Sequence, residues 1–165
     1  MKSLLLIRHA KSSWDMDVDD FDRPLNHRGQ NDAPQMAKRL LEKEINIDGF
    51  ISSPAKRALT TATFFAEIYK RKPADIRTIP SLYEPNIEAF YNAIYSLDDN
   101  FKTVAVFSHN PTITDFANQL TSFKVDELPT CAVFAVKADL KDWKEFKSAK
   151  KEFWFFDYPK ADVSR

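Results

Sequence analysis

The chain has 165 residues, with 24 basic and 24 acidic side chains and a single cysteine. That length predicts one domain over residues 1–165, and an apolar content of 44% indicates a globular protein rather than a disordered one. The balanced charge gives no reason to expect nucleic acid or an acidic membrane surface as the main partner. One cysteine cannot form an intramolecular disulfide, and no apolar run approaches the roughly 18 residues of a membrane span. We therefore expect a cytoplasmic protein without a membrane partner.

The N-terminal part of the chain begins with a strand pattern and continues with a helix pattern. An unbroken apolar run over residues 3–8 predicts a strand that is covered on both faces. After a polar loop, helical spacing begins near Asp32, and Pro34 suits a helix only in its first turn. We expect this helix to pack through an apolar face that consists of Met36, Leu40 and Leu41.

A second strand and helix follow. Residues 48–53 have a short strand pattern, and a strong helix pattern continues over residues 53–72. Ser53 is a good N-cap residue and Pro54 suits the first helical position, so we expect the helix to begin there. Its apolar positions, at helical spacing, are Ala58, Ala62, Phe65 and Ile68.

The rest of the chain continues this alternation of strands and helices. Helix patterns and strand patterns follow one another, with helices at 86–97 and 110–120 and strands at 74–80, 102–109, 131–138 and 151–158. We expect the last of these strands at a sheet edge. The alternation predicts an α/β fold of three layers, in which helices cover both faces of a largely parallel central sheet.

Three junctions between a strand and the next helix carry basic or imidazole side chains. Arg8 and His9 follow the first strand, and His109 ends the strand pattern at 102–109. Arg57 falls in the first turn of the helix after the second strand. In open α/β sheets, ligands bind beyond the carboxyl ends of the strands, so these four side chains should converge on one crevice.

Two arginines, two histidines and two helix N-termini suit a tetrahedral dianion. Arginine pairs bidentately with phosphate oxygens, and helix N-termini add N–H donors. The chain has only two glycines and no glycine-rich phosphate loop, so the arginines would take its place. A neutral His9 could attack phosphorus and hold the phosphoryl group, while His109, if protonated, would stabilise the charge on its oxygens. Taken singly, each residue is more often an ordinary core or surface residue, and only their joint occurrence favours the phosphate site.

Two other features suggest a function at first sight. The acidic loop from Asp15 to Asp22 begins like an EF-hand, but Asp20 stands where glycine is needed and Asn26 stands where the bidentate glutamate belongs. A solvated acidic loop fits better, so we expect no metal, and the role of the loop stays open. Cys131 falls in a strand pattern, where a buried, inert thiol is more common than a nucleophile.

Four segments of the chain resemble the histidine phosphatase superfamily, which has the phosphoglycerate-mutase-like fold. Arg8-His9 in "LLLIRHAKSSW" is similar to the R-H motif of that family. "ISSPAKRALTTA" is similar to its S-P-x-x-R-A-x-x-T-A block, and "VAVFSHNPTI" resembles its second-histidine block, with Ser108 in place of the usual glycine. "RPLNHRGQNDAPQMAKRL" resembles the matching segment of the short branch, the SixA-type phosphohistidine phosphatases.

This resemblance implies a role for each matching residue. His9 would accept the phosphoryl group, and the residues that bind it would be Arg8, Arg57 and His109. Larger members of the family carry an acidic proton donor after the third strand, where this chain has Glu84 in "SLYEPN". The short branch often lacks a clear acid there, so Glu84 is a candidate general acid and an exposed loop carboxylate is the alternative. We expect no cofactor.

Three functions stay open on these grounds. The first is a metal-independent phosphatase of phosphohistidine on proteins, which suits a chain with little spare length for a lid. The second is a phosphatase of a small phosphate ester, with the same chemistry and a different pocket. The third is a non-catalytic module that binds phosphoproteins, although an intact His9 with its three partners argues against it.

Overall fold

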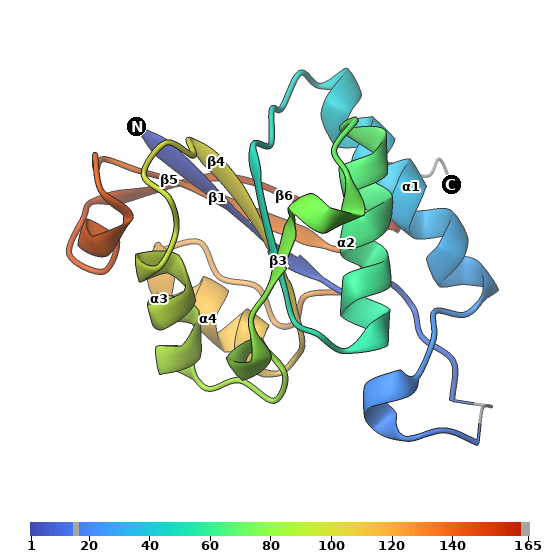
Figure 1. Ribbon diagram of the computed structural model, residues 1–165. Helices are drawn as coiled ribbons and strands as arrows, with labels where there is room; N and C mark the ends of the chain where they lie inside the picture. Colours follow the sequence, from blue (N-terminus) through green and yellow to red (C-terminus); the bar gives the residue numbers. More distant parts are fainter. Residues whose placement is uncertain (15–16, 163–165) are drawn as a thin grey trace.

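A six-stranded sheet forms the centre of the computed structural model, which describes residues 1–14 and 17–162 (Figure 1). The strands are β1 (Lys2–Arg8), β2 (Gly49–Ser52), β3 (Ile76–Thr78), β4 (Thr103–Ser108), β5 (Val133–Ala138) and β6 (Lys151–Asp157). They lie in the order β3-β2-β4-β1-β5-β6. The first four in this order are parallel, whereas β5 and β6 are antiparallel to their neighbours. The predicted α/β class, the largely parallel sheet and the edge position of the last strand are confirmed.

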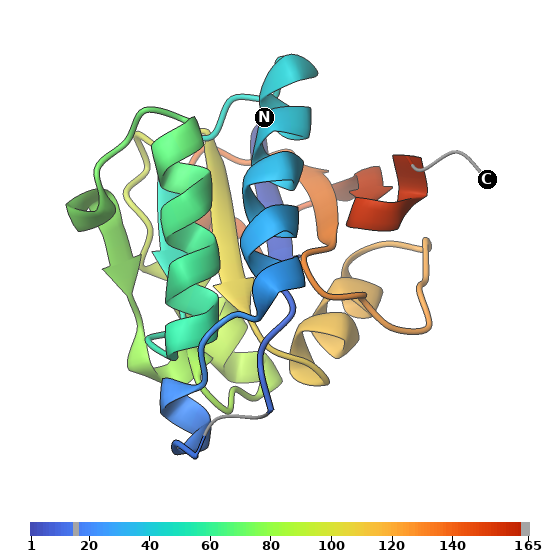
Figure 2. The same cartoon turned by 90° about the vertical axis from the view of Figure 1, so that its right-hand side faces the viewer.

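Two helices cover each face of the sheet (Figures 1 and 2). One face carries α1 (His27–Glu42) and α2 (Lys56–Ile68), and the other carries α3 (Ile87–Tyr95) and α4 (Thr112–Leu120). The three-layer arrangement is therefore confirmed. Within residues 1–14 and 17–162, none of the helices is long and apolar enough to cross a membrane.

The central strand β1 contributes side chains to both faces, because successive residues of a strand point to opposite sides. Leu4 and Leu6 belong to the core beneath α3 and α4. Leu5 and Ile7 belong to the core beneath α1 and α2. All four side chains are at most 1% exposed, and each contributes about 1.5–3 kcal/mol of burial free energy. This two-sided burial explains the unbroken apolar run in the sequence.

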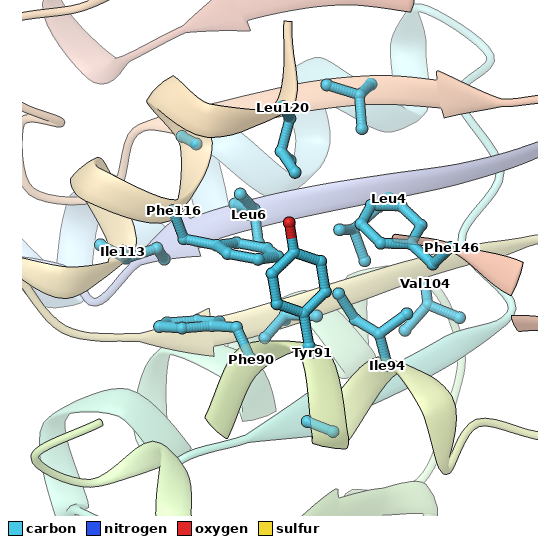
Figure 3. Close-up of a cluster of buried hydrophobic side chains, with 14 of the residues drawn as sticks. Leu4, Leu6, Phe90, Tyr91, Ile94, Val104, Ile113, Phe116, Leu120 and Phe146 are labelled. Carbon is cyan, nitrogen blue, oxygen red and sulfur yellow. The ribbon is translucent and has the colours of Figure 1, made fainter. Parts of the chain in front are cut away.

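Aromatic side chains fill much of the core beneath α3 and α4 (Figure 3). Phe90 of α3 stacks on Phe116 of α4 with ring centroids 4.9 Å apart, and Tyr91 meets Phe116 edge-on at 5.0 Å. Such pairs add about 0.5–1.5 kcal/mol beyond the burial of their surface. They hold α4 against α3, and α4 begins three residues after His109.

β1 and β4 end at the same level of the sheet. Their register pairs Arg8 with Ser108, and the backbone N–H of His9 donates to the Ser108 carbonyl at 3.2 Å. On the other side of β4, Ser52 at the end of β2 pairs with Phe107. The residues that follow these three strands therefore meet at one edge of the sheet.

The first helix differs from the sequence-based expectation at its start. α1 begins at His27 rather than near Asp32, because the Asn26 side chain accepts a hydrogen bond from the Gly29 N–H at 2.9 Å. Pro34 consequently lies inside the helix and not in its first turn. Its missing N–H costs one intrahelical hydrogen bond, and the helix continues past it because one face is buried.

Two further expectations about the helices are wrong. Leu41 is 41% exposed, although the other two expected apolar positions of α1 are buried. α2 begins at Lys56 with Ala55 as its N-cap, so Ser53 and Pro54 precede the helix. The Ser53 hydroxyl oxygen instead accepts a hydrogen bond from the Ala55 N–H at 3.1 Å, which stabilises the turn before the helix.

Candidate active site

A cavity of about 280 Å³ lies where β1 and β4 end. The structure brings four of the predicted site residues together in its lining, namely Arg8, His9, Arg57 and His109. Its lining also includes Trp14, Asp20 and Arg23, which lie on the loop between β1 and α1. The position agrees with the general rule that ligands of parallel sheets bind beyond the carboxyl ends of the strands.

His9 is held in one orientation at the end of β1. Its Nδ1 lies 2.8 Å from the Ala10 carbonyl oxygen. A carbonyl can only accept a hydrogen bond, so Nδ1 carries the proton and Nε2 is the unprotonated nitrogen. The Ala10 N–H in turn donates to the Thr61 hydroxyl of α2 at 2.9 Å, which fixes the backbone beneath the ring.

Burial lowers the pKa of His9 to about 3. The hydrogen bond to Ala10 opposes this shift, whereas the charges of Arg57 and Arg8 and the neighbouring ring of His109 add to it. The ring is only 7% exposed, so desolvation of the charged form is the main cause. His9 is therefore neutral at pH 7.

His109 lies opposite His9, with ring centroids 5.2 Å apart. Its Nε2 lies 2.7 Å from the Ser53 hydroxyl oxygen. Burial, followed by the charge of Arg57, lowers the pKa of His109 to about 4. The negative charge of Asp20 raises the pKa of His109, but it offsets only part of this lowering. At pH 7 the site therefore favours a neutral His109, so the role suggested for a protonated ring does not apply at that pH.

Arg8 and Arg57 are each anchored through part of the guanidinium group. Arg8 Nη1 donates to the Leu128 carbonyl at 2.9 Å, and Arg57 donates to the Asp20 carbonyl at 2.7 Å and to its carboxylate at 3.0 Å. Three buried atoms of the site lack a hydrogen-bond partner among the described residues: Arg8 Nε, Arg57 Nε and His109 Nδ1. Unsatisfied donors beside two positive charges suit an oxyanion with several acceptor atoms.

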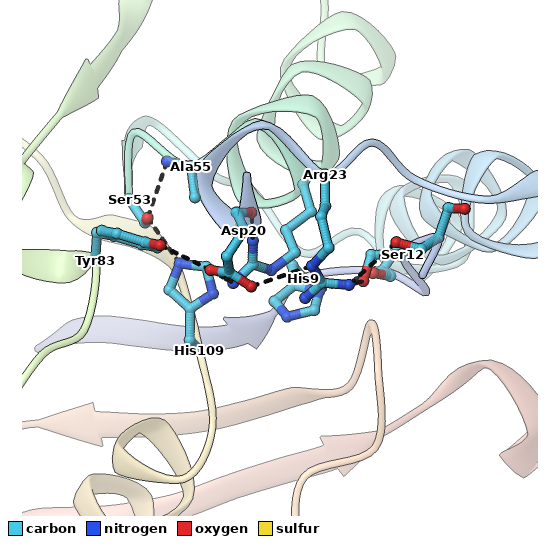
Figure 4. A network of polar contacts seen from close by, with 11 residues as sticks. His9, Ser12, Asp20, Arg23, Ser53, Ala55, Tyr83 and His109 are labelled. Carbon is cyan, nitrogen blue, oxygen red and sulfur yellow. Dashed lines mark hydrogen bonds and ion pairs between the residues drawn. The ribbon is translucent and has the colours of Figure 1, made fainter. Parts of the chain in front are cut away.

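Asp20 links the two sides of the site, although the sequence marked it only as a residue that breaks an EF-hand pattern (Figure 4). Its carboxylate accepts hydrogen bonds from Arg57, from Arg23 Nε at 3.1 Å and from the Tyr83 hydroxyl at 2.7 Å. These bonds, that of Tyr83 first, lower the pKa of Asp20 to about 2, so the carboxylate stays ionised and cannot donate a proton at pH 7. Asp20 sits in a loop that looked merely acidic, and residues 15–16 of that loop lie outside the described residues.

Arg23 is a further cation of the site that sequence reasoning missed. It is 6% exposed, and its Nη1 donates to the Ser12 hydroxyl at 2.7 Å and to the Ser13 carbonyl at 3.2 Å. The Trp14 ring lies over its guanidinium at 3.5 Å. Arg23 opens the segment "RPLNHRG", so the sequence signal for it lies within the block that resembles the short branch of the family.

Glu84 lies in a second cavity that adjoins the first. This cavity, of about 310 Å³, shares Asp20, Arg57 and His109 with the first and adds Tyr83 and Glu84. Glu84 is exposed and has a φ of 52°, a left-handed conformation that costs a residue other than glycine about 1–2 kcal/mol. The structure therefore places Glu84 beside the residues that are predicted to bind phosphate and not among them.

The structure also bears on the two features of uncertain function. Among the described residues, no three His, Cys, Asp or Glu side chains gather where they could hold a metal ion. Cys131 is fully buried, and burial raises the pKa of its thiol far above the usual value. That environment fits an inert thiol.

Sequence comparison relates the chain to one family and to relatives of unknown activity. The model of the histidine phosphatase superfamily (branch 1) matches residues 4–93. An uncharacterized chloroplastic protein of Arabidopsis thaliana is 30% identical over 154 residues, which span 87% of this chain and 70% of the relative.

Solved structures with the same fold extend over nearly the whole chain. The protein histidine phosphatase SixA complexed with tungstate is 21% identical, with 95% of this chain and 97% of that one covered and a TM-score of 0.80. A SixA phosphohistidine phosphatase candidate from Agrobacterium tumefaciens is 22% identical, with 96% and 98% covered and a TM-score of 0.79. A mycobacterial glucosyl-3-phosphoglycerate phosphatase is 13% identical, with 99% and 100% covered and a TM-score of 0.67. The phosphoglycerate-mutase-like fold is thereby confirmed.

Proposed function

The chain belongs to the histidine phosphatase superfamily (branch 1), and from that membership we propose that it removes phosphoryl groups by way of a phosphorylated His9. The state of His9 carries this proposal. Its Nδ1–H is bonded to the Ala10 carbonyl, which leaves Nε2 unprotonated, and the ring lines a cavity together with three arginines. Burial keeps the ring neutral, as a nucleophile must be.

The reaction has two steps. In the first, the lone pair of His9 Nε2 forms a bond to phosphorus, the bond from phosphorus to the leaving nitrogen or oxygen breaks, and the leaving group takes up a proton. In the second, water attacks phosphorus, the bond to His9 breaks, and inorganic phosphate leaves with neutral His9 restored. Arg8 and Arg57 stabilise the negative charge on the phosphoryl oxygens in both steps.

Phosphohistidine on a protein is the substrate class that the mouth of the cavity supports best. Trp14, which lines the cavity, is 74% exposed, and Phe21, next to the cavity residue Asp20 in the chain, is 38% exposed. Trp14 lies over Arg23, and Phe21 meets Tyr83 edge-on at 5.1 Å, so both rings are held in place although they face solvent. Exposed aromatic side chains around a charged site are typical of surfaces that bind proteins.

The acids of the site also suit a phosphoramidate such as phosphohistidine. Asp20 is held in its ionised form by Arg57, Arg23 and Tyr83. Glu84 is then the carboxyl group of the two cavities that could donate a proton. A protonated imidazole leaves readily without such help, whereas an alkoxide needs a proton from an acid.

A small phosphate ester is the second candidate substrate, and the adjoining cavity favours it. That cavity has room for a leaving group of moderate size next to Arg57 and His109, with Glu84 in its wall. The glucosyl-3-phosphoglycerate phosphatase with the same fold acts on such an ester, as its name states.

Turnover of the two substrate classes by the same preparation tests the proposal. We expect the kcat/KM for a phosphohistidine protein to exceed that for each member of a panel of metabolite phosphates. A metabolite with the higher value would favour the second candidate. Binding of the phosphoprotein without turnover of any substrate would overturn the proposed activity and favour a binding module. EDTA should leave turnover unchanged, whereas a loss that magnesium restores would contradict the metal-independent reaction.

A further inference from the structure

The hydroxyl group of Ser53 lies against His109, just after β2 (Figure 4). The Ser53 oxygen and His109 Nε2 are 2.7 Å apart. Ser53 is 0% exposed and His109 is 6% exposed, so water has little access to this contact. The hydrogens of both groups must therefore be satisfied within the protein.

The partners of Ser53 decide which group donates. Its oxygen already accepts a hydrogen bond from the Ala55 N–H at 3.1 Å, and a serine hydroxyl has one hydrogen to donate. If His109 Nε2 carried a proton, the serine oxygen would accept twice, and its own hydrogen would lack an acceptor among the described residues. If Nε2 is unprotonated, Ser53 donates to it, and the Nδ1–H of the neutral ring is the one group of this pair left without a partner among the described residues. The first arrangement leaves two such groups, the serine hydrogen and the lone pair of Nδ1. The second arrangement is favoured, because each buried polar group without a partner is destabilising.

An unprotonated Nε2 places the proton of a neutral ring on Nδ1. Nδ1 of His109 is buried and has no hydrogen-bond partner in residues 1–14 and 17–162. His109 lines the cavity opposite His9, and its ring lies between Ser53 and His9 in Figure 4. The edge of the ring that does not contact Ser53 thus offers a hydrogen-bond donor to a group bound in the cavity.

We propose that Ser53 holds neutral His109 as the Nδ1–H tautomer, so that His109 donates a hydrogen bond to the transferring phosphoryl group without being protonated. Ser53 is then a positioning residue that acts through His109. The kinetic part of this inference rests on the proposed function, whereas the tautomer is a property of the unliganded protein and is tested independently.

This arrangement resolves a conflict between the two histidines. The burial that keeps His9 nucleophilic also lowers the pKa of His109 to about 4, which removes the charge that His109 would otherwise use. If the tautomer is fixed, His109 still has its Nδ1–H as a hydrogen-bond donor, although the ring carries no positive charge. The charged and titratable groups that face His109 are Arg8, His9, Asp20, Arg23, Arg57 and Tyr83.

Nitrogen NMR of protein labelled with ¹⁵N-histidine tests the tautomer directly. The chain has three histidines, so the spectrum can be assigned with single His variants. At pH 7 we expect His109 to show a protonated Nδ1 and an unprotonated Nε2. In Ser53→Ala, the ¹⁵N chemical shifts of the two nitrogens should move toward each other, as in a mixture of tautomers, or interchange, as in the opposite tautomer. Ser52→Ala is the control, because it removes the neighbouring buried hydroxyl, which donates to the Ser53 carbonyl and not to His109. This variant should keep the wild-type pattern.

A protonated Nε2 in the wild-type protein would overturn the inference by itself, whether or not any variant folds. The same holds if Ser53→Ala keeps the wild-type pattern. If instead the tautomer is as proposed but the protein turns over no substrate, the proposed function fails and the assignment of the tautomer stands.

The kinetic test separates this role from a structural one through its pH dependence. Ser53→Ala should lower kcat about 10- to 100-fold at pH 7, because a donor to the transition state is partly lost. Since a protonated His109 has an N–H on both nitrogens, the deficit should shrink as the pH falls toward 4.5. Ser53→Thr keeps the hydroxyl and should restore most of the rate. A deficit that is constant over this pH range would contradict the proposal.

Discussion

The buried end of the cavity, here called its floor, and the exposed rim, its mouth, differ in how firmly the protein holds their side chains and shields them from water. His9, Arg57 and His109 on the floor are 6–7% exposed and are attached to the ends of strands or to the first turn of a helix. Trp14 and Glu84 at the mouth are exposed and lie on loops. Burial sets the protonation states on the floor, so under the proposed function the floor determines the reaction. In the same proposal the mouth contacts the molecule that carries the phosphoryl group, so it determines the substrate.

The largest effect should come from the nucleophile on the floor. His9→Ala should lower turnover of every substrate by about 10⁴-fold or more, the scale of removing a covalent nucleophile. Acid quench of the wild-type enzyme with ³²P-labelled substrate should trap a phosphoryl adduct that is labile in acid and stable in base, and this adduct should be missing in the variant.

The exposed His27 provides the matched control for this variant. His27→Ala changes the same side chain outside the cavity and should keep both turnover and adduct. An adduct that maps to a serine or to Cys131, or one that survives in His9→Ala, would contradict the role of His9.

Glu84→Gln should give the next largest effect, and it should depend on the leaving group. If Glu84 is the general acid, hydrolysis of alkyl phosphates should slow by about 10²- to 10⁴-fold. Hydrolysis of p-nitrophenyl phosphate should barely change, because that leaving group needs little protonation. Phosphohistidine should also be spared if its ring nitrogen takes a proton from water. The ratio of kcat values for the three substrates is the measurement.

Two other outcomes would change the interpretation of Glu84. Equal losses on all three substrates would mean that Glu84 supports the loop or orients His109. No loss on any substrate would make it an exposed loop carboxylate, and this outcome would favour phosphohistidine as the substrate.

The aromatic side chains at the mouth should matter for protein substrates alone. Trp14→Ala and Phe21→Ala should each lower the kcat/KM for a phosphohistidine protein about tenfold, as expected when an aromatic contact worth about 1.4 kcal/mol is removed. The kcat/KM for phosphoramidate, which is too small to reach the mouth, should stay the same. Leu41→Ala, at a comparably exposed apolar position of α1, serves as the control. A similar loss on both substrates would place these rings in the reaction site.

The smallest effect concerns folding stability, and it tests whether burial controls the histidines. The folded pKa values of His9 and His109, about 3 and about 4, lie below the value of about 6.5 expected in the unfolded chain. The unfolded state therefore binds more protons between pH 6.5 and 4, and the free energy of unfolding should fall as the pH drops through this window. Each histidine contributes at most about 1.4 kcal/mol per pH unit.

Urea unfolding at several pH values measures this slope. His9→Asn and His109→Asn should each make the curve flatter between pH 6.5 and 4. The window lies above the pH range in which Asp20, with its pKa lowered to about 2, would add a slope of the same sign. An unchanged slope in both variants would show that burial does not set the protonation of the histidines.

The sequence by itself determined the α/β alternation and the four candidate site residues that the structure brings together in the cavity. The alternation of strands and helices can be recognised from the sequence because the spacing of apolar residues is a local property. Arg8, His9, Arg57 and His109 could be identified because each lies at a junction between a strand and the segment that follows it, and parallel strands bring their carboxyl ends to one edge. The start of α1 was missed although its signal, the Asn26 cap, is also local.

Only the tertiary structure decided the network around Asp20 and the charge of His109. Asp20 and Tyr83 are 63 residues apart in the chain, and their hydrogen bond follows from how two loops meet over the cavity. The same holds for Ser53 and His109, which are 56 residues apart. The pKa of a histidine depends on how much water the surrounding fold removes from it. A histidine in the same local sequence can therefore be charged in one fold and neutral in another. The sequence could name the groups of the site, but their protonation and hydrogen-bond partners depend on burial, which is a property of the whole fold.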